Sequence, residues 1–202
     1  TTSGDPGFGG IVTKWDLFVQ DFIFGSIRAH FDEVRLYGEE EKDCIFKNTA
    51  LSKALTLVID PIDGTEWFSR GEDEFSILVT LLKDFKAIWS AGLFPKKRKL
   101  FIASETRVFI DTMQGKNQTE FTLTGTAAET TIAAHYRLGR GDFRKGYDTL
   151  ARNGFKILMN GDGFGTNLTA VEKFFQNDVS AFIAAKMSIV DGFPVAHLIK
   201  SA

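Results

Sequence analysis

The pattern of apolar and polar positions divides the chain into alternating helical and extended segments. Between Lys14 and His30, apolar residues such as Phe18 and Phe22 recur at roughly helical spacing, which predicts an amphipathic helix. Residues 54–59 form an uninterrupted apolar run that is typical of a buried strand. We expect this strand to end at Asp60-Pro61, because proline donates no hydrogen bond to a sheet.

Further extended segments follow this pattern, and several are close enough along the chain to pair as antiparallel neighbours. Strands are predicted at residues 34–37, 75–82, 86–94, 99–103, 107–110, 154–159 and 180–184. Two more helices are expected, one from about Leu168 to Gln176 and one that Asp191 opens. Residues 111–130 show no clear pattern. Interleaved strands and helices predict a layered α/β fold.

Composition and charge restrict the classes of protein that this chain can belong to. Of 202 residues, 44% are hydrophobic and 25% are charged, as in a soluble globular protein. The net charge of −2 gives no reason to expect nucleic acid or an anionic membrane as a partner. Cys44 has no second cysteine with which to pair, and no apolar run reaches membrane-spanning length, so we expect a cytoplasmic protein. Its 20 phenylalanines are spread along the chain, which predicts core packing.

The amino-acid composition divides the chain into a short N-terminal segment and one domain. Residues 1–10 are rich in Gly, Pro, Ser and Thr and are expected to be a flexible N-terminal segment. Residues 11–202 are expected to form a single domain with two sub-lobes, with a boundary near 105–135.

Candidate chemistry lies directly after the predicted buried strand, in residues 60–65. The carboxylates of Asp60 and Asp63 would converge at the carboxyl end of this strand, where α/β sheets usually bind ligands. Hard oxygen ligands without histidine or cysteine favour Mg2+, and the Ile62 carbonyl is a possible further ligand. Gly64 allows the backbone to approach a phosphate at the start of a following helix. An ordinary turn explains the same residues, and spacing alone leaves the two interpretations balanced.

Asp60-Pro61-Ile62-Asp63-Gly64-Thr65 resembles the signature of the inositol monophosphatase superfamily, which comprises Mg2+-dependent phosphatases, many of them lithium-sensitive. Gly38-Glu39-Glu40 and Val12-Thr13-Lys14-Trp15-Asp16 resemble two more motifs of this superfamily, in the same order and at similar spacing. Gly165-Thr166 and the apolar segment led by Asp191 resemble its C-terminal motifs. The resemblance covers the chain from about residue 11 to its last residue.

This resemblance implies an αβαβα sandwich, a homodimer and a role for each matching residue. The implied ligands of two or three Mg2+ ions are Glu39, Asp60, the Ile62 carbonyl, Asp63 and Asp191. The implied phosphate- and substrate-binding residues are Gly64, Thr65, Gly165, Thr166 and Asp191. The implied catalytic residues are Asp16, Glu39 and Thr65, which would activate the attacking water with support from Glu40. Taken singly, Glu39-Glu40-Glu41 is typical of a solvated acidic loop, Asp16 of a helix surface and Asp191 of a helix cap.

Three departures from the family pattern concern the substrate. Val190 stands where many members have tryptophan, and Ala184 stands where inositol-preferring members carry a glutamate. The segment Thr65-Glu66-Trp67 replaces the Thr-Lys-Gly or Thr-Lys-Glu of the adenosine bisphosphate branch. We therefore expect hydrolysis of a small phosphate monoester, an inositol monophosphate-like compound or histidinol phosphate. A 3'-phosphoadenosine bisphosphate or fructose bisphosphate phosphatase is the alternative within the superfamily, and a catalytically weak regulatory protein is the alternative outside it.

Overall fold

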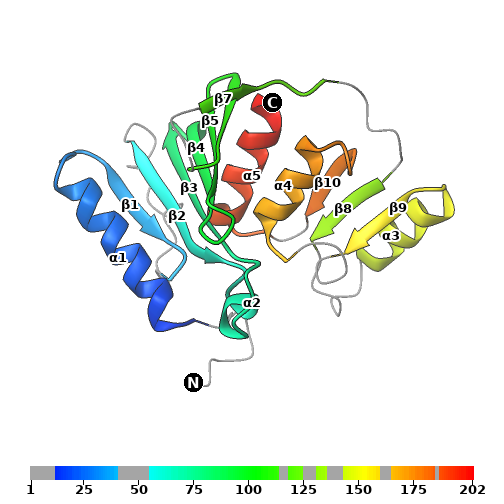
Figure 1. Ribbon diagram of the computed structural model, residues 1–202, viewed down its shortest axis with the longest axis horizontal. Coiled ribbons are helices and arrows are strands. Elements are labelled where there is room, and N and C mark those ends of the chain that lie inside the picture. Colours follow the sequence, from blue (N-terminus) through cyan, green and yellow to red (C-terminus); the bar gives the residue numbers. More distant parts are fainter. Residues whose placement is uncertain are drawn as a thin grey trace.

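The fold is a stack of five layers of helix and sheet (Figure 1). The computed structural model describes residues 12–40, 55–113, 118–124, 131–135, 143–159, 165–184 and 187–202. Its helices are α1 (Lys14–Arg28), α2 (Thr65–Ser69), α3 (Phe143–Arg152), α4 (Asn167–Phe175) and α5 (Ile189–Ser201). Helix α1 is followed by a seven-stranded sheet, then by α4 and α5, a three-stranded sheet and α3 (Figure 1). This order confirms the predicted layered α/β sandwich. The expected N-terminal segment 1–10 lies outside the described residues.

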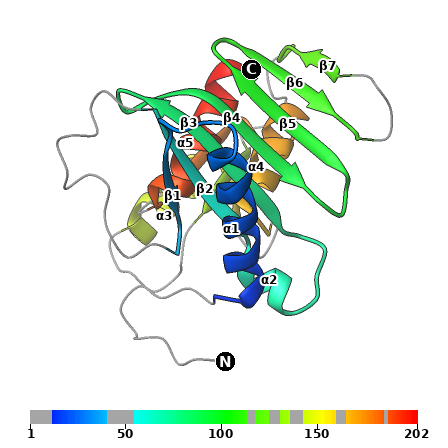
Figure 2. The ribbon, with the colours of Figure 1, turned by 90° about the vertical axis from the view of Figure 1, so that its left-hand side faces the viewer.

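The seven strands of the large sheet lie side by side in chain order. They are β1 (Arg35–Gly38), β2 (Thr56–Asp63), β3 (Ser76–Lys83), β4 (Lys86–Phe94), β5 (Lys99–Ser104), β6 (Arg107–Asp111) and β7 (Gln118–Phe121). Strands β1 and β2 are parallel, and all later neighbours are antiparallel. Every residue of β2 is buried, because α1 packs against one face of this strand and α5 against the other (Figures 1 and 2).

The expectation that Pro61 ends the second strand is wrong. Strand β2 continues to Asp63, and its pairing with β3 becomes irregular between Asp60 and Asp63. Asp60 lies opposite Leu78 and Asp63 opposite Ser76, so two residues of β2 face one residue of β3. A bulge of this kind accommodates proline, because its missing N–H group has no partner to satisfy. The bulge also turns successive side chains of β2 away from strict alternation.

The small sheet is parallel, and one of its strands was not predicted, as β7 of the large sheet was not. It consists of β8 (Thr131–His135), β9 (Lys156–Met159) and β10 (Ala181–Ala184), in the order β10-β8-β9. Helix α3 packs against β9 on the outer side (Figure 1). We predicted neither β8 nor α3. Strand β8 is short and built partly from alanine, so its signal is weak. Helix α3 has Phe143, Tyr147 and Leu150 at helical spacing, so its pattern was present in the sequence and was overlooked.

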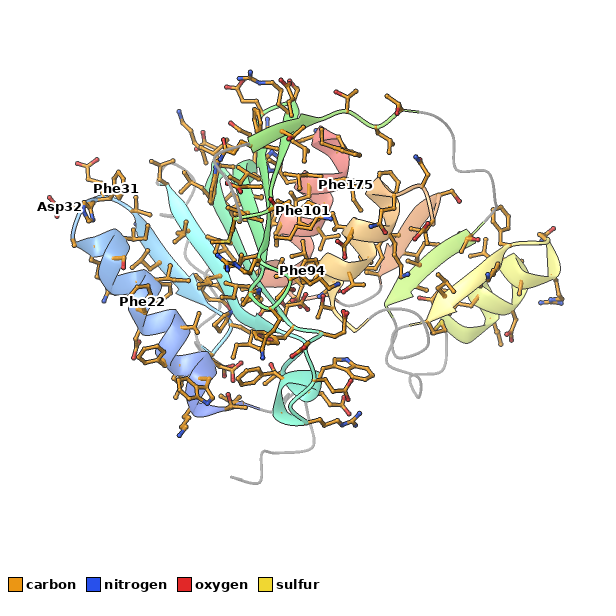
Figure 3. All side chains as sticks on the ribbon, in the orientation of Figure 1. Phe22, Phe31, Asp32, Phe94, Phe101 and Phe175 are labelled. Atoms are coloured by element: carbon orange, nitrogen blue, oxygen red, sulfur yellow. The ribbon has the colours of Figure 1, made fainter. Side chains whose placement is uncertain are left out.

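The main core lies between the large sheet and helices α4 and α5. Its buried aromatic residues include Phe94, Phe101 and Phe175, whose rings contact one another edge-on or tilted (Figure 3). The expectation that phenylalanines pack in the core is wrong for Phe18, Phe22 and Phe31, which are 60%, 67% and 57% exposed. Phe22 lies on α1 and Phe31 just after it (Figure 3).

Helix α1 confirms the predicted helix but turns an unexpected face to the sheet. Its buried residues are Asp16, Gln20 and Phe24, at intervals of four, whereas Phe18 and Phe22 lie on the exposed side. The face that the sequence marks as apolar is therefore not the buried face. None of the described helices has the length and apolar composition required to cross a bilayer.

Candidate active site

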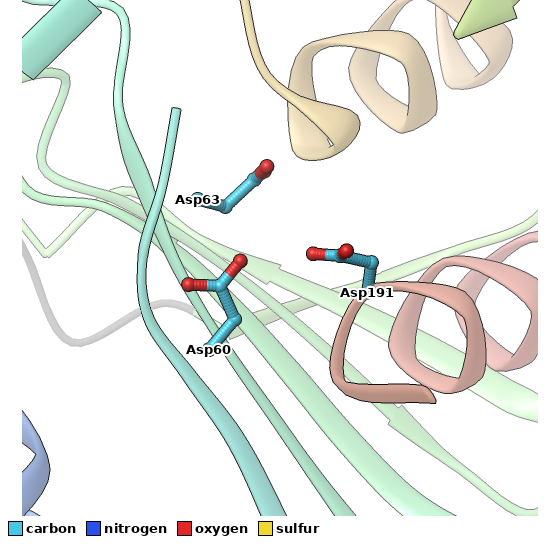
Figure 4. A group of neighbouring side chains, drawn as sticks. All are labelled: Asp60, Asp63 and Asp191. Atoms are coloured by element: carbon cyan, nitrogen blue, oxygen red, sulfur yellow. The ribbon is translucent and has the colours of Figure 1, made fainter. Parts of the chain in front are cut away.

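Three aspartates meet at the carboxyl end of β2. Asp60 and Asp63 come from the bulged end of that strand, and Asp191 comes from the first turn of α5 (Figure 4). One carboxylate oxygen of each residue lies within 4.8 Å of the others. Asp60 and Asp63 are only 2% and 5% exposed, and Asp191 is half-buried. The structure thus brings together three of the predicted metal ligands, from two elements that lie far apart in the sequence.

Asp63 is held by donors from two neighbouring elements. Its Oδ2 atom accepts hydrogen bonds from Ser76 Oγ at 2.7 Å, Asn167 N at 2.8 Å and Leu168 N at 3.3 Å. Its Oδ1 atom accepts one from Asn167 Nδ2 at 2.9 Å. These bonds connect the end of β2 to the start of β3 and to the first turn of α4, so the carboxylate cannot rotate without breaking several of them.

Asp191 is oriented by two side chains. Ser188, at the start of α5, donates from Oγ to Asp191 Oδ2 at 3.0 Å. Asn167 Nδ2 donates to Asp191 Oδ1 at 3.4 Å. Asp60 instead accepts a bond within its own segment, from Ile62 N to Oδ1 at 3.0 Å. The carbonyl oxygen of Ile62 accepts a hydrogen bond from Thr65 Oγ1 at 2.8 Å.

Burial and mutual repulsion raise the pKa of the carboxyl groups in this cluster. Loss of hydration, followed by the charges of Glu39, Asp191 and Asp63, raises the pKa of Asp60 well above its usual range. Loss of hydration and the charge of Asp191 raise the pKa of Asp63 to about 7, although its hydrogen bonds oppose this shift. So many acidic groups with raised pKa values are stable as anions only beside a compensating cation.

Glu39 adds a fourth carboxyl group from the turn after β1. Loss of hydration, then the charge of Asp191, raises its pKa to about 7, while a hydrogen bond with Asp60 opposes the shift. Glu39 is exposed as a whole residue, but its carboxyl group reaches the cluster and is hydrogen-bonded to Asp60. The neighbouring Glu40 is half-buried, and loss of hydration and the charge of Asp16 raise its pKa.

Asp16 and Thr65 form a second part of the site, beside the Ile62 carbonyl. Asp16 is fully buried, and its Oδ2 atom accepts from Thr13 N at 2.7 Å and Thr13 Oγ1 at 2.6 Å, which caps α1. Its Oδ1 atom lies 3.3 Å from Thr65 Oγ1. The Thr65 hydroxyl is therefore placed between the Asp16 carboxylate and the Ile62 carbonyl at 2.8 Å.

The side chain of Gln20 fills the space beside Gly38. A Cβ atom at Gly38 would lie 1.6 Å from Gln20 Oε1 and 2.1 Å from Gln20 Cδ. Gln20 stands one helical turn after Asp16 on the buried face of α1. A side chain at Gly38 would therefore displace the Gln20 amide from the buried face of α1 that also carries Asp16.

The predicted substrate-binding elements are also adjacent. Gly64 has φ +89°, and a Cβ atom there would lie 2.8 Å from Thr166 Cγ2 and 3.1 Å from the Glu74 carbonyl. Thr166 is fully buried and caps α4, accepting a hydrogen bond from Thr169 N at 3.1 Å. A Cβ atom at Gly165 would lie 3.5 Å from Trp67 Cδ1. The two loops thus meet beside the carboxylate cluster.

Asn167, Ser76 and Ser188 contact the aspartates and were missed by the sequence analysis. Asn167 and Asp63 are 104 positions apart, and no pattern within one sequence connects such residues. A polar residue directly after the Gly165-Thr166 element was the one available signal. A polar residue at this position is equally typical of a helix cap.

Comparison with known proteins places this site in a family. The inositol monophosphatase family profile matches residues 1–164. The 3'(2'),5'-bisphosphate nucleotidase CysQ of Haemophilus influenzae is 38% identical over 79 residues, which are 39% of this chain and 29% of that protein. The CysQ of Aggregatibacter actinomycetemcomitans is 32% identical over 77 residues, 38% of this chain and 28% of that protein. These alignments cover less than a third of the curated relatives.

Solved structures share the fold over nearly the whole chain. An IMPase of Thermotoga maritima superposes with a TM-score of 0.72 at 20% identity, covering 97% of this chain and 71% of that chain. The extragenic suppressor protein SuhB of Bartonella henselae gives 0.74 at 17% identity, covering 95% and 70%. At such identities the likeness shows the fold alone. Together with the family profile, it shows that this chain belongs to the inositol monophosphatase family.

Proposed function

We propose that the chain is a Mg2+-dependent phosphatase that hydrolyses a small phosphate monoester with water as the nucleophile. The observation that carries this proposal is the convergence of Asp60, Asp63 and Asp191, with oxygen atoms within 4.8 Å of one another. Membership of the inositol monophosphatase family supports the reaction class, because these aspartates are among the metal ligands that the resemblance to this family implies.

The residues present fit divalent cations. All three clustered ligands are carboxylates, which hard cations such as Mg2+ prefer, and the cluster includes no histidine or cysteine among the described residues. The buried amide of Asn167 adds an Oδ1 atom that has no hydrogen-bond partner in the described part of the chain. Asp60, Asp63 and Asp191 would hold one ion, and Glu39 and the Ile62 carbonyl would help to hold a further ion beside Asp60. Bound ions of this kind lower the pKa of water and neutralise charge on the transferred phosphoryl group.

Asp16 and Thr65 are proposed to position the attacking water. One oxygen of Asp16 is occupied by the cap of α1, so the other remains to accept a proton from the Thr65 hydroxyl. The oxygen of that hydroxyl can then accept a hydrogen bond from water and draw off its proton. Glu39, whose carboxyl group interacts with Asp60 and Asp191, is proposed to assist in activating the water. Glu40, which interacts with Asp16, is proposed to support it.

Gly64, Thr65, Gly165 and Thr166 are proposed to bind the phosphate and the rest of the substrate. Their loops are adjacent and lie beside the carboxylates. Ala184 has no carboxylate that could bind a sugar ring. The candidate substrates are therefore histidinol phosphate or another small monoester, as well as an inositol monophosphate-like compound. A 3'(2'),5'-bisphosphate nucleotide is the second candidate, because both curated relatives carry that activity in their names.

A substrate panel tests the proposal. Phosphate release is measured with and without Mg2+ on inositol monophosphate, histidinol phosphate, fructose bisphosphate and 3'-phosphoadenosine 5'-phosphate. We expect Mg2+-dependent turnover of at least one compound, and its loss in Asp63→Asn, which removes an anionic ligand. Asp73→Asn removes an exposed carboxylate paired with Lys96 and serves as the matched control that retains activity. A folded protein that turns over none of these compounds would favour a regulatory or interaction role.

The family resemblance extends the proposal to the whole molecule. We propose a cytoplasmic homodimer whose activity is inhibited by Li+. Sedimentation velocity measures the oligomeric state, and titration with LiCl at fixed Mg2+ measures the inhibition.

A further inference from the structure

Asn167 occupies the space between two of the three clustered aspartates. It is the first residue of α4 and is 2% exposed. Its single Nδ2 atom lies 2.9 Å from Asp63 Oδ1 and 3.4 Å from Asp191 Oδ1. Its backbone N–H group also donates to Asp63, at 2.8 Å. One residue therefore connects β2 to α5 through the carboxylates that these elements contribute.

The oxygens that Asn167 contacts are those left over for a cation. Asp63 Oδ2 already accepts from Ser76, from Asn167 N and from Leu168 N. Asp191 Oδ2 accepts from Ser188. The Oδ1 atoms of both aspartates accept none of these bonds, and Asn167 Nδ2 donates to both of them.

We propose that Asn167 is a positioning residue that holds Asp63 and Asp191 at the separation a shared divalent cation requires. The inference rests on the proposed metal centre and adds a residue to it. Two carboxylates at this distance repel each other, and a donor shared between them offsets part of that repulsion before an ion arrives. Without the amide, the ion itself must draw the two groups together and order them, so its affinity falls.

The position of Asn167 is fixed by the rest of α4. Thr166 caps this helix, and Leu168 is fully buried against β4, where a Cβ atom on Gly92 would lie 2.4 Å from Leu168 Cδ1. The amide therefore works from a rigid support. The two hydrogen bonds of Asn167 to Asp63 hold the amide group in place beside the cluster.

Binding of Mn2+ to metal-free protein tests the proposal without turnover. Free Mn2+ is followed by electron paramagnetic resonance for the unaltered chain, Asn167→Leu, which keeps the side-chain volume, and Asn167→Ala, which cannot clash. Thr169→Val is the matched control, because it removes a hydrogen bond from the same turn, to Glu74, without contacting the aspartates. We expect Mn2+ affinity to fall about tenfold to a hundredfold in both Asn167 variants. We expect it to stay within about twofold in Thr169→Val, even where the melting temperature drops equally.

A second readout separates positioning from chemistry. With any substrate that the panel identifies, the Asn167 variants should need more Mg2+ for half-maximal activity, while saturating Mg2+ restores most of kcat. A folded Asn167 variant that binds Mn2+ as tightly as the unaltered chain overturns the proposal, and so does an unaltered chain that binds no Mn2+. Tight Mn2+ binding without turnover of any substrate overturns the proposed function but leaves Asn167 to be judged on the binding data.

Discussion

At the scale of single residues, one buried carboxylate serves both the fold and the site. Asp16 closes the cap of α1 with one oxygen and faces Thr65 with the other. A surface residue of a helix would have neither constraint, and Asp16 is fully buried. The start of α1 is consequently tied to the turn after β2, and a change at Asp16 affects stability and activity together. Thr65 is the better residue for isolating the chemistry.

Replacing Thr65 tests the proposed activation of water. Thr65→Val keeps the shape of the side chain but removes the hydroxyl that lies between Asp16 and the Ile62 carbonyl. We expect kcat to fall by about a hundredfold to ten-thousandfold, the usual range for loss of acid–base assistance. Thr65→Ser keeps the hydroxyl and should retain most of the activity. Equal kcat values for the two variants, measured at saturating Mg2+, would contradict the assigned role.

The sequence allowed the acidic residues of the site to be predicted, because Asp60, Asp63 and Asp191 stand in recognisable motifs. Their partners could not be predicted in the same way. Ser76 begins a strand and Asn167 begins a helix, and both are ordinary residues for those places. Their importance comes from packing between elements, which local patterns do not encode.

At the scale of elements, the turn between β2 and α2 is limited by its backbone and its neighbours. Gly64→Ala places a side chain at φ +89° and within 2.8 Å of Thr166 Cγ2. Gly71→Ala is a matched control, since Gly71 has φ +79° but nothing within 4 Å of a Cβ atom. Left-handed backbone strain costs both variants about 1–2 kcal/mol. Crowding should cost Gly64→Ala about 1–3 kcal/mol more.

Chemical denaturation of both glycine variants, together with the phosphatase assay, measures this difference. We expect Gly64→Ala to lose activity as well as stability, because the strained turn carries Thr65. Gly71→Ala should lose only stability. Equal free energies of unfolding for the two variants would show that Thr166 and Glu74 yield to the added methyl group.

Most elements with a strong pattern were predicted, and elements that depend on tertiary context were not. Strands β3 and β4 are long and mostly apolar segments on either side of a tight turn, in which Asp84 and Phe85 have positive φ. Strand β8 lacks such a signal and is defined by its neighbours in the small sheet. Helix α3 carries Phe143, Tyr147 and Leu150 at helical spacing, and this signal was overlooked. The prediction that β2 ends at Pro61 was wrong, because Pro61 lies in a bulge where no hydrogen bond from its backbone nitrogen is needed.

At the scale of the whole molecule, the acidic cluster makes stability depend on both pH and divalent cations. The pKa of Asp63 and that of Glu39 are raised to about 7, so the metal-free folded state keeps protons that the unfolded chain releases near pH 4–4.5. The folded state therefore binds more protons between these values, and stability falls as the pH rises from about 4 to about 7. Mg2+ replaces those protons, so its stabilising effect should grow over the same range.

Melting temperatures in EDTA and in Mg2+, at about pH 5.5 and about pH 8, measure this coupling. We expect a larger increase with Mg2+ at the higher pH. Asp63→Asn, which cannot titrate at this position, should show a smaller fall in stability with pH in EDTA. An equal increase with Mg2+ at both pH values would indicate that the cluster is already ionised at the lower pH.

The convergence of β2 and α5 on one cluster also has a consequence for synthesis on the ribosome. Asp60 and Asp63 leave the exit tunnel long before Asp191, which lies in the last helix of the described chain. A nascent chain can pair the strands of the large sheet, whose neighbours are consecutive, before α5 exists. During that interval the chain lacks one of the three clustered carboxylates, and the cation site is complete only after α5 has been synthesised. Cleavage before residue 189 would remove Asp191 together with a helix that packs against the large sheet, so the cation site and part of the core would be lost together.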